Sequence, residues 1–166
     1  MEDERLAIGG IKLSPSLVLF RWDAFDPEAL ESCFERLGAN RINLPVVWID
    51  TSANVSSARF CIDAGESEQA LPILQAFGDI QPIARVVALS VYPFGKRLTL
   101  LGRVLQAFAE SRLAIHAVVS SLASIVVLGD DTQREACVEA LLCHLRLPEN
   151  HAPFEPEFRV RYQERS

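Results

Sequence analysis

The spacing of apolar positions along this chain alternates between the period of a strand and the period of a helix. Short runs rich in β-branched and aromatic residues predict strands, and apolar residues three or four positions apart predict helices that pack by one face. The predicted strands are 17–20, 41–50, 58–62, 86–92, 113–119, 123–128 and 158–162, and the predicted helices are 27–37, 66–77, 99–111 and 132–145. This mixture indicates an α+β protein.

The start of the first predicted helix carries clear local signals. Asp26 suits the capping position, Pro27 suits the first helical position, and Glu28 places an acid near the positive end of the helix. Further along, Pro45 interrupts the predicted strand 41–50. Because proline cannot donate a ladder hydrogen bond, we expect this strand at a sheet edge or with a bulge.

The two halves of the chain repeat one order of elements. A shift of 71 positions carries six apolar positions onto six others, namely Leu30, Cys33, Phe34, Leu37, Ile42 and Leu44 onto Leu101, Val104, Leu105, Phe108, Leu113 and Ile115. A shift of 66 carries Phe60 onto Val126 and Ala70 onto Ala136. The shared order β-α-β-β-α-β is that of a ferredoxin-like unit. We therefore predict two such units in tandem, 1–81 and 82–166, each an antiparallel sheet with helices on one face.

Composition and charge narrow the range of partners. The chain of 166 residues is 49% hydrophobic and 23% charged, as in ordinary globular proteins. Its formal charge of -6 argues against broad contact with nucleic acid or with anionic membranes. Neither a signal peptide nor an apolar run of about 20 residues is present in the sequence. We expect a cytoplasmic protein whose partners are small molecules or proteins.

The chemistry-bearing residues form no recognisable reaction centre. The cysteines at 33, 61, 137 and 143 lie inside apolar periodic segments and lack the paired spacing of a zinc site, so we expect buried thiols. The histidines do not cluster with cysteines or carboxylates, and Gly95-Lys96 lacks the rest of a phosphate-binding loop. We therefore expect no cofactor, no bound metal and no enzymatic activity.

Two stretches resemble a known family. GRVLQAFAESRLAIHAVVSSLASIVVL and CFERLGANRINLPVV are similar to the helix-to-hairpin portion of an ACT domain, in which a helix with an R-V-F-x-A-L core is followed by I-N-I, an I-S-x-S turn and a V-V strand. With GGIKLSPSLVLF and IQPIARVVALSVY, the chain from about Gly9 to Tyr162 resembles the tandem ACT regulatory region of aspartate kinases without the kinase segment. The resemblance implies a sensor in which the loop before the first helix of one unit faces the second strand of another, with an amino acid between them.

The resemblance also implies candidate ligand contacts in the first unit. Asp26, Pro27 and Glu28 match the loop before the helix, and Asn43 and Leu44 match the start of the second strand. Glu28 stands where the family has glycine, and glutamate brings bulk and charge to that point. Asn43 and Asp26 also have purely structural explanations, a local backbone hydrogen bond and a helix cap.

The second unit keeps fewer polar positions. Thr99 falls in the loop before its first helix, and Ala114 and Ile115 fall at its second strand, where Ala114 replaces the asparagine. Leu122 stands where the family often has glutamate. The resemblance therefore assigns this unit backbone contacts at most, and we expect it to serve mainly in assembly.

Two functions fit these observations. The first is a non-catalytic regulatory module that binds an amino acid or similar small metabolite at the interface between ACT units. The alternative is a ligand-free scaffold or regulatory subunit that pairs with an enzyme through ACT–ACT contacts. The second strand of each unit should lie at a sheet edge, and the LAIHAVVS edge lacks proline and strong charge. We expect a homodimer through the second units or pseudo-symmetric packing within the chain, with Pro45 disfavouring pairing through the first edge.

Overall fold

The computed structural model of the chain describes residues 5–52, 55–151 and 154. These residues divide into two compact units. We call residues 16–85 the inserted unit, and we call residues 5–15 together with the described residues from 86 to 154 the split unit, because the chain enters it twice.

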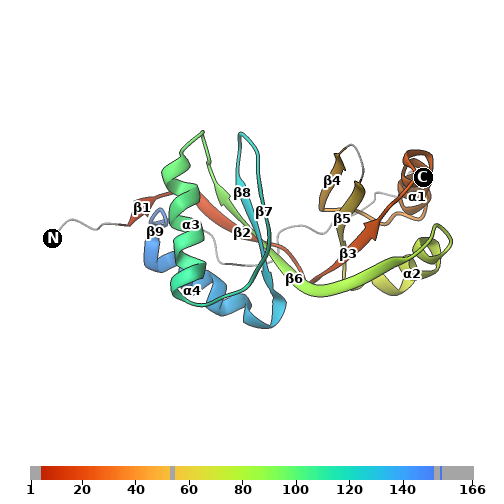
Figure 1. Cartoon of the computed structure of the whole chain (residues 1–166). Helices are drawn as coiled ribbons and strands as arrows, with labels where there is room; N and C mark the ends of the chain where they lie inside the picture. The colour runs from red at the N-terminus through yellow and green to blue at the C-terminus, as the bar shows by residue number, and fades with distance from the viewer. Residues whose placement is uncertain (1–4, 53–54, 152–153, 155–166) are drawn as a thin grey trace, which may run out of the picture. The chain divides into compact units, whose positions relative to one another are not determined.

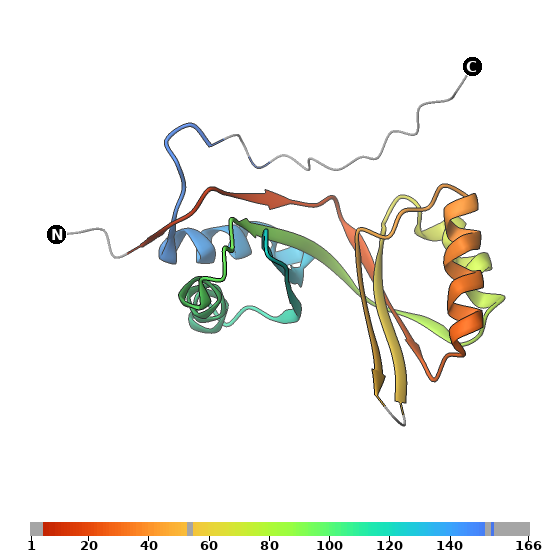
Figure 2. The ribbon, with the colours of Figure 1, turned by 90° about the horizontal axis from the view of Figure 1, so that it is seen from above.

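The inserted unit has the strand order of a ferredoxin-like domain. Its elements are β3 (Leu17–Asp23), α1 (Pro27–Ala39), β4 (Val46–Ser52), β5 (Val55–Asp63), α2 (Ser67–Gln75) and the first part of β6 (Ile80–Tyr92) (Figure 1). The strands lie in the order β4-β5-β3-β6, and β5 is antiparallel to both β4 and β3. Figure 2 shows α1 and α2 on the same side of these strands.

The core of the inserted unit fills the space between its helices and its sheet. Phe20 of β3 lies directly opposite Phe60 of β5, and their rings stack with centroids 5.7 Å apart. Phe34 of α1 meets Phe60 edge-on at the same centroid separation. Cys33 and Leu37, one helical turn apart on α1, are fully buried against this group. The helical and strand periods read from the sequence therefore converge on one aromatic cluster.

The split unit repeats this architecture with a different chain connection. Its elements are β1 (Leu6–Ala7), β2 (Gly10–Leu13), the remainder of β6, α3 (Leu98–Glu110), β7 (Ile115–Ser120), β8 (Ile125–Asp130), a 3₁₀ turn (Asp131–Gln133), α4 (Arg134–His144) and β9 (Leu145–Arg146). The sheet order is β2-β6-β8-β7, and β1 forms a separate parallel pair with β9. The predicted α+β class and ferredoxin-like order are thus confirmed in both units.

The strand β2 completes the sheet of the split unit. β2 pairs antiparallel with β6, from Gly10 opposite Tyr92 to Leu13 opposite Leu89. On the other side of β2, the N–H of Ile11 donates to Nε2 of His151 at 3.1 Å. The predicted boundary between 1–81 and 82–166 differs from this grouping, because β2 pairs with the second half of the chain. The predicted strand 158–162 lies outside the described residues.

The two predicted shifts between the halves of the chain have different outcomes: the first helices follow the predicted shift of 71, and the later elements do not follow the predicted shift of 66. α1 and α3 coincide at a shift of 71 positions, and buried Leu37 matches buried Phe108. Buried Phe60 and Leu74, however, match buried Val127 and Leu141, which is a shift of 67. The predicted shift of 66 is therefore wrong by one residue. Because successive strand side chains point to opposite faces of the sheet, a shift of 66 would match the buried Phe60 with a side chain on the other face.

The edge strands β4 and β7 also refine the predictions. β4 lies at the sheet edge as expected, but it begins at Val46, after Pro45, and pairs with β5 without interruption from Val46 to Ser52. Pro45 therefore gives no reason against pairing through this edge. In β7 the register shifts between Ile115 and Ala117, which is a bulge. A bulge is one of the devices that protect an exposed strand edge.

Close packing at Gly129 yields a test of the split-unit core. A Cβ at Gly129 would lie 2.9 Å from Sγ of Cys137 and 3.5 Å from Cε1 of Phe108. Gly129→Ala should lower the free energy of unfolding by about 1–3 kcal/mol, because overpacking forces core side chains out of position. Gly102→Ala is the matched control, since nothing in the described residues lies within 4 Å of its added Cβ apart from its chain neighbours and the backbone of its own helix. It should raise stability by about 0.5–1 kcal/mol through helix propensity. Urea denaturation of both variants measures the difference, and equal effects would contradict this packing.

Candidate functional site

The predicted contacts before α1 are exposed. Asp26 occupies the N-cap position with an extended backbone, and its carbonyl accepts a hydrogen bond from the N–H of Leu30 at 3.0 Å. Its side chain makes no capping hydrogen bond within the described residues. Asp26 therefore occupies the N-cap position without satisfying a backbone N–H of the first turn by its carboxylate. Pro27 is the first helical residue, and Glu28 is an acid of the first turn. Both carboxylates at this helix start remain open to solvent.

The predicted contacts after α1 have a partner already. Asn43 is exposed, and its backbone N–H donates to Oε2 of Glu66 at 3.4 Å. Leu44 is half-buried and packs against the core of the inserted unit. The family resemblance assigns the backbone N–H of Asn43 to a ligand. In this structure the Glu66 carboxylate accepts from that N–H through a long and exposed hydrogen bond.

Each unit separates its predicted contacts by the length of a helix. Asp26 to Glu28 stand at the start of α1, and Asn43 follows its end. A helix of 13 residues spans about 20 Å. The same separation applies in the split unit, where Thr99 lies at the start of α3 and Ala114 lies past its end. No single unit brings its two groups of predicted contacts together within the described residues.

The corresponding loop of the split unit presents apolar side chains. Leu98 and Leu122 are 74% and 76% exposed. The loop before α3 is held to the turn between β7 and β8 by backbone hydrogen bonds, from Phe94 to Ala123 at 3.0 Å and from Gly95 to Leu122 at 3.3 Å. Thr99 and Ala114 are exposed and Ile115 is half-buried. This end of the unit therefore exposes two leucine side chains beside its backbone groups and the hydroxyl of Thr99.

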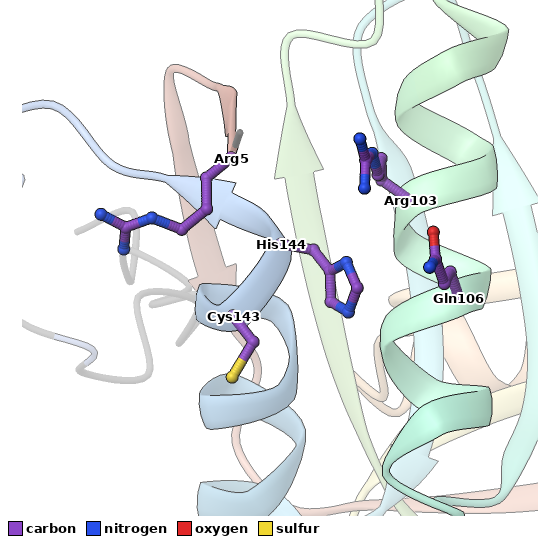
Figure 3. Close-up of a pocket in the computed structure, with 5 residues that line it drawn as sticks. All are labelled: Arg5, Arg103, Gln106, Cys143 and His144. Atoms are coloured by element: carbon purple, nitrogen blue, oxygen red, sulfur yellow. The ribbon is translucent and has the colours of Figure 1, made fainter. Parts of the chain in front are cut away.

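A pocket that the sequence did not indicate lies in the split unit. It has a volume of about 260 Å³ and is lined by Arg5, Arg103, Gln106, Cys143 and His144. Arg103 and Gln106 project from α3 towards His144 of α4, while Arg5 and Cys143 lie on the other side of His144 (Figure 3). Three segments far apart in the sequence contribute to it. Only their tertiary arrangement brings these side chains into one pocket.

Hydrogen bonds around Glu110 fix the helix side of this pocket. Nε2 of Gln106 donates to Oε1 of Glu110 at 2.6 Å, and Nε2 of His144 lies 2.9 Å from Oε2. The hydrogen bond from Gln106, followed by the interaction with His144, holds the pKa of Glu110 below its ordinary value. Glu110 therefore stays ionised at neutral pH and anchors two lining side chains.

Arg5 is brought to the pocket by the β1–β9 pair. Leu6 of β1 lies opposite Leu145, directly after α4. The guanidinium of Arg5 donates to the carbonyl of Leu142 at 3.5 Å, near the C-terminal end of α4, where a cation is favourable.

The cysteines divide into three buried thiols and one exposed thiol. Cys33, Cys61 and Cys137 are buried as expected, and burial raises their pKa values to about 11, about 12 and about 11. The expectation of burial is wrong for Cys143, which is exposed. On α4 the buried residues are Cys137, Ala140 and Leu141, and position 143 falls off that stripe. The helical period could have revealed this.

Metal and membrane chemistry find no support in the described residues. No group of three or more His, Cys, Asp or Glu side chains is placed to hold a metal ion there. Within the same residues, none of the helices has the length and apolar character needed to cross a bilayer.

Comparison with solved structures decides the fold. No protein-family model matches the chain, and no curated protein matches it significantly. The regulatory subunit of aspartate kinase from Thermus flavus matches with a TM-score of 0.71 and 16% identity, over 82% of this chain and 97% of that chain. The ligand-free regulatory subunit from Thermus thermophilus matches with a TM-score of 0.72 and 16% identity, over 84% and 99%. The chain has the fold of aspartate kinase regulatory subunits.

The aspartate kinase regulatory fold also occurs inside longer chains. E. coli aspartokinase III in complex with lysine and aspartate matches with a TM-score of 0.63 and 16% identity, over 87% of this chain and 34% of that chain. This chain therefore corresponds to about a third of that enzyme. The described residues contain two units of the regulatory fold and no kinase domain.

The thiol arrangement predicts a selective alkylation. At pH 8 the folded protein should take up one equivalent of iodoacetamide, at Cys143, because the other thiols are buried and largely protonated. Intact-mass measurement followed by peptide mapping identifies the site. In denaturant all four cysteines should react. Rapid labelling of a second cysteine without denaturant would contradict the packing of the unit that contains it.

Proposed function

We propose that this chain is a non-catalytic regulatory subunit that binds an amino acid or a similar small metabolite between paired units. The observation that carries the proposal is the likeness to regulatory subunits of aspartate kinases, which extends over 97% and 99% of two such chains. Regulation by occupancy would follow if the ligand changes how units pair.

The separation of the predicted contacts supports a ligand shared by two units. The start of α1 and the residues before β4 lie about 20 Å apart along α1, a distance that a free amino acid cannot bridge. A complete site would combine the helix start of one unit with the second strand of another. Formation of the site and association of the units would then be one event.

The polarity of the two half-sites fits a zwitterion. Asp26 and Glu28 are exposed acids that can face an ammonium group. The exposed Asn43 offers a backbone N–H and a side-chain amide to a carboxylate, and this N–H is already in contact with the Glu66 carboxylate. A ligand carboxylate would replace Glu66 at little cost, because the present hydrogen bond is long and exposed.

A screen of the 20 amino acids by thermal shift tests ligand binding. A ligand at 100 times its Kd should stabilise the protein by about 2.7 kcal/mol. Asn43→Ala should weaken binding of the ligand found by roughly tenfold, because the side-chain amide that would hydrogen-bond the ligand is lost. Asn40→Ala is the control, since its side chain donates to Arg36 within the last turn of α1 and lies outside the proposed contacts. Unchanged affinity in Asn43→Ala would remove Asn43 from the site.

A second candidate function is a ligand-free scaffold that pairs with an enzyme. The exposed Leu98 and Leu122 favour it, because exposed leucines suit a protein contact better than a polar ligand. If no amino acid stabilises the protein in the thermal-shift screen, the result favours this second function.

A homodimer through the edge of β7 is the assembly that we propose. Beyond its bulge, β7 offers an edge from Ala117 to Ser120 that lacks charged residues. Val119→Lys should convert the dimer to a monomer, because an edge lysine opposes strand addition. Thr51→Lys, on the other edge strand β4, should leave the dimer intact. Light scattering at tens of micromolar measures both, and a monomeric unmodified protein would contradict the proposal.

A further inference from the structure

The outer side of β2 is covered by the segment that follows β9. Among the described strands, β2 pairs only with β6, so the other side of its backbone has no strand beside it. On that side, the N–H of Ile11 donates to Nε2 of His151 at 3.1 Å. We propose that His151 is a pH-sensitive latch, which holds residues 147–151 on β2 while its imidazole is neutral and releases them when the imidazole gains a proton.

The local structure after β9 places His151. Residues 147–151, which we call the latch segment, follow β9 directly. The N–H of Ile8 donates to the carbonyl of Arg146 at 3.1 Å, so β9 already holds the chain beside the N-terminal strands. The N–H of His151 then donates to the carbonyl of Pro148 at 3.1 Å and closes a β-turn. The position of the imidazole against β2 therefore follows from β9 and from this turn.

Apolar packing supports the imidazole on both sides of the latch segment. Leu147 and Phe154 are half-buried and pack against the core of the split unit. The ring centroids of Phe154 and His151 lie 5.1 Å apart. Gly10 provides the space on β2, because a Cβ there would lie 3.0 Å from Nε2 of His151 and closer still to Oη of Tyr92. The imidazole is thus held against the β2 backbone by a hydrogen bond and by close packing.

The direction of the hydrogen bond fixes the protonation state of the imidazole. A backbone N–H can only donate, so Nε2 of His151 accepts, and the ring is neutral with its proton on Nδ1. An imidazolium carries N–H groups on both nitrogens and cannot accept. Protonation would set two donors face to face and leave the N–H of Ile11 without its acceptor. The closed latch therefore binds one proton fewer than the open latch, and falling pH favours opening.

The pH range of the switch is set by imidazole chemistry. The neighbouring segments carry other ionisable groups, namely Lys12 on β2, Tyr92 on β6, Arg97 before α3, Arg146 in β9 and Glu149 in the latch segment. Carboxyl groups ordinarily titrate near about pH 4, phenols and ammonium groups near about pH 10, and guanidinium groups higher still. Imidazole ordinarily changes its charge between about pH 5 and 8. A change confined to that range therefore reports on a histidine.

The tautomer of His151 is the first test and needs no variant to be informative. Nitrogen-15 NMR of histidine-labelled protein at pH 7.5 should show Nε2 of His151 unprotonated and the proton on Nδ1, with the signal assigned by its absence in His151→Gln. A proton on Nε2 at pH 7.5 would overturn the proposal, because a protonated nitrogen cannot accept from Ile11.

Hydrogen exchange at Ile11 measures opening of the latch. The protection factor compares the exchange rate of an amide with its rate in an unstructured chain at the same pH. For Ile11 it should fall at least about tenfold between pH 7.5 and pH 5.5, because the N–H loses its hydrogen bond. Ser14 is the internal reference, since its N–H donates to the Ala88 carbonyl at 2.9 Å. Its protection should stay unchanged, which separates latch opening from loss of the β2–β6 pairing.

Matched variants assign the pH dependence to one histidine. His151→Gln keeps a side-chain carbonyl that accepts at every pH, so it should abolish the pH dependence of Ile11 protection. His116→Gln makes the same change at an exposed position on β7, at the far edge of the sheet, and should leave the pH dependence as in the unmodified protein. An unmodified protein with pH-independent protection of Ile11, or an undiminished pH dependence in His151→Gln, would overturn the proposal. The residues of the latch are distinct from those of the proposed amino-acid site.

Discussion

The backbone ladder along β6 is the interaction on which both units depend. The first part of this strand completes the sheet of the inserted unit beside β3. The second part is an inner strand of the split unit, paired on one side with β8 and on the other with β2. Val87 and Leu89, two positions apart on β6, are fully buried in the core of the split unit. Loss of regular pairing along β6 would therefore remove a sheet position from each core at once.

Local patterns in the sequence predicted the parts of the fold that depend on local physics. The start of α1 follows from Asp26 and Pro27. The apolar stripes of α1 and α3 predict both helices, which bury Cys33 and Val104 as expected. The partner of β2 was not predictable in this way, because an alternating strand pattern does not specify which distant strand supplies its hydrogen bonds. Pro45 shows the same limit, since its missing N–H excludes it from a ladder without showing on which side of it the strand begins.

The two candidate sites show the same difference between local features, which the sequence predicts, and tertiary arrangement, which it does not. The proposed amino-acid contacts were predictable because they stand beside helix ends, where cap and loop residues carry a sequence signature. The structure adds that each helix holds its two groups of contacts apart, which a linear motif does not reveal. The pocket of the split unit had no sequence signature, because Arg5, Arg103 and Cys143 come from segments with unrelated periodicity. Only the exposure of Cys143 could have been inferred beforehand, from its place off the buried stripe of α4.

The pairing of β2 with β6 also sets the order in which the chain can fold during synthesis. The inserted unit, 16–85, is contiguous, so all its strands leave the ribosome within one stretch of chain. The split unit needs Ile11 to meet Val91, and the rest of its core needs β8 and α4, which are made later still. Its long-range contacts close large loops and therefore form slowly. Until they form, the apolar side chains of Ile11 and Leu13 have no core to enter, and this nascent segment is the part of the chain with the greatest need of protection from premature association.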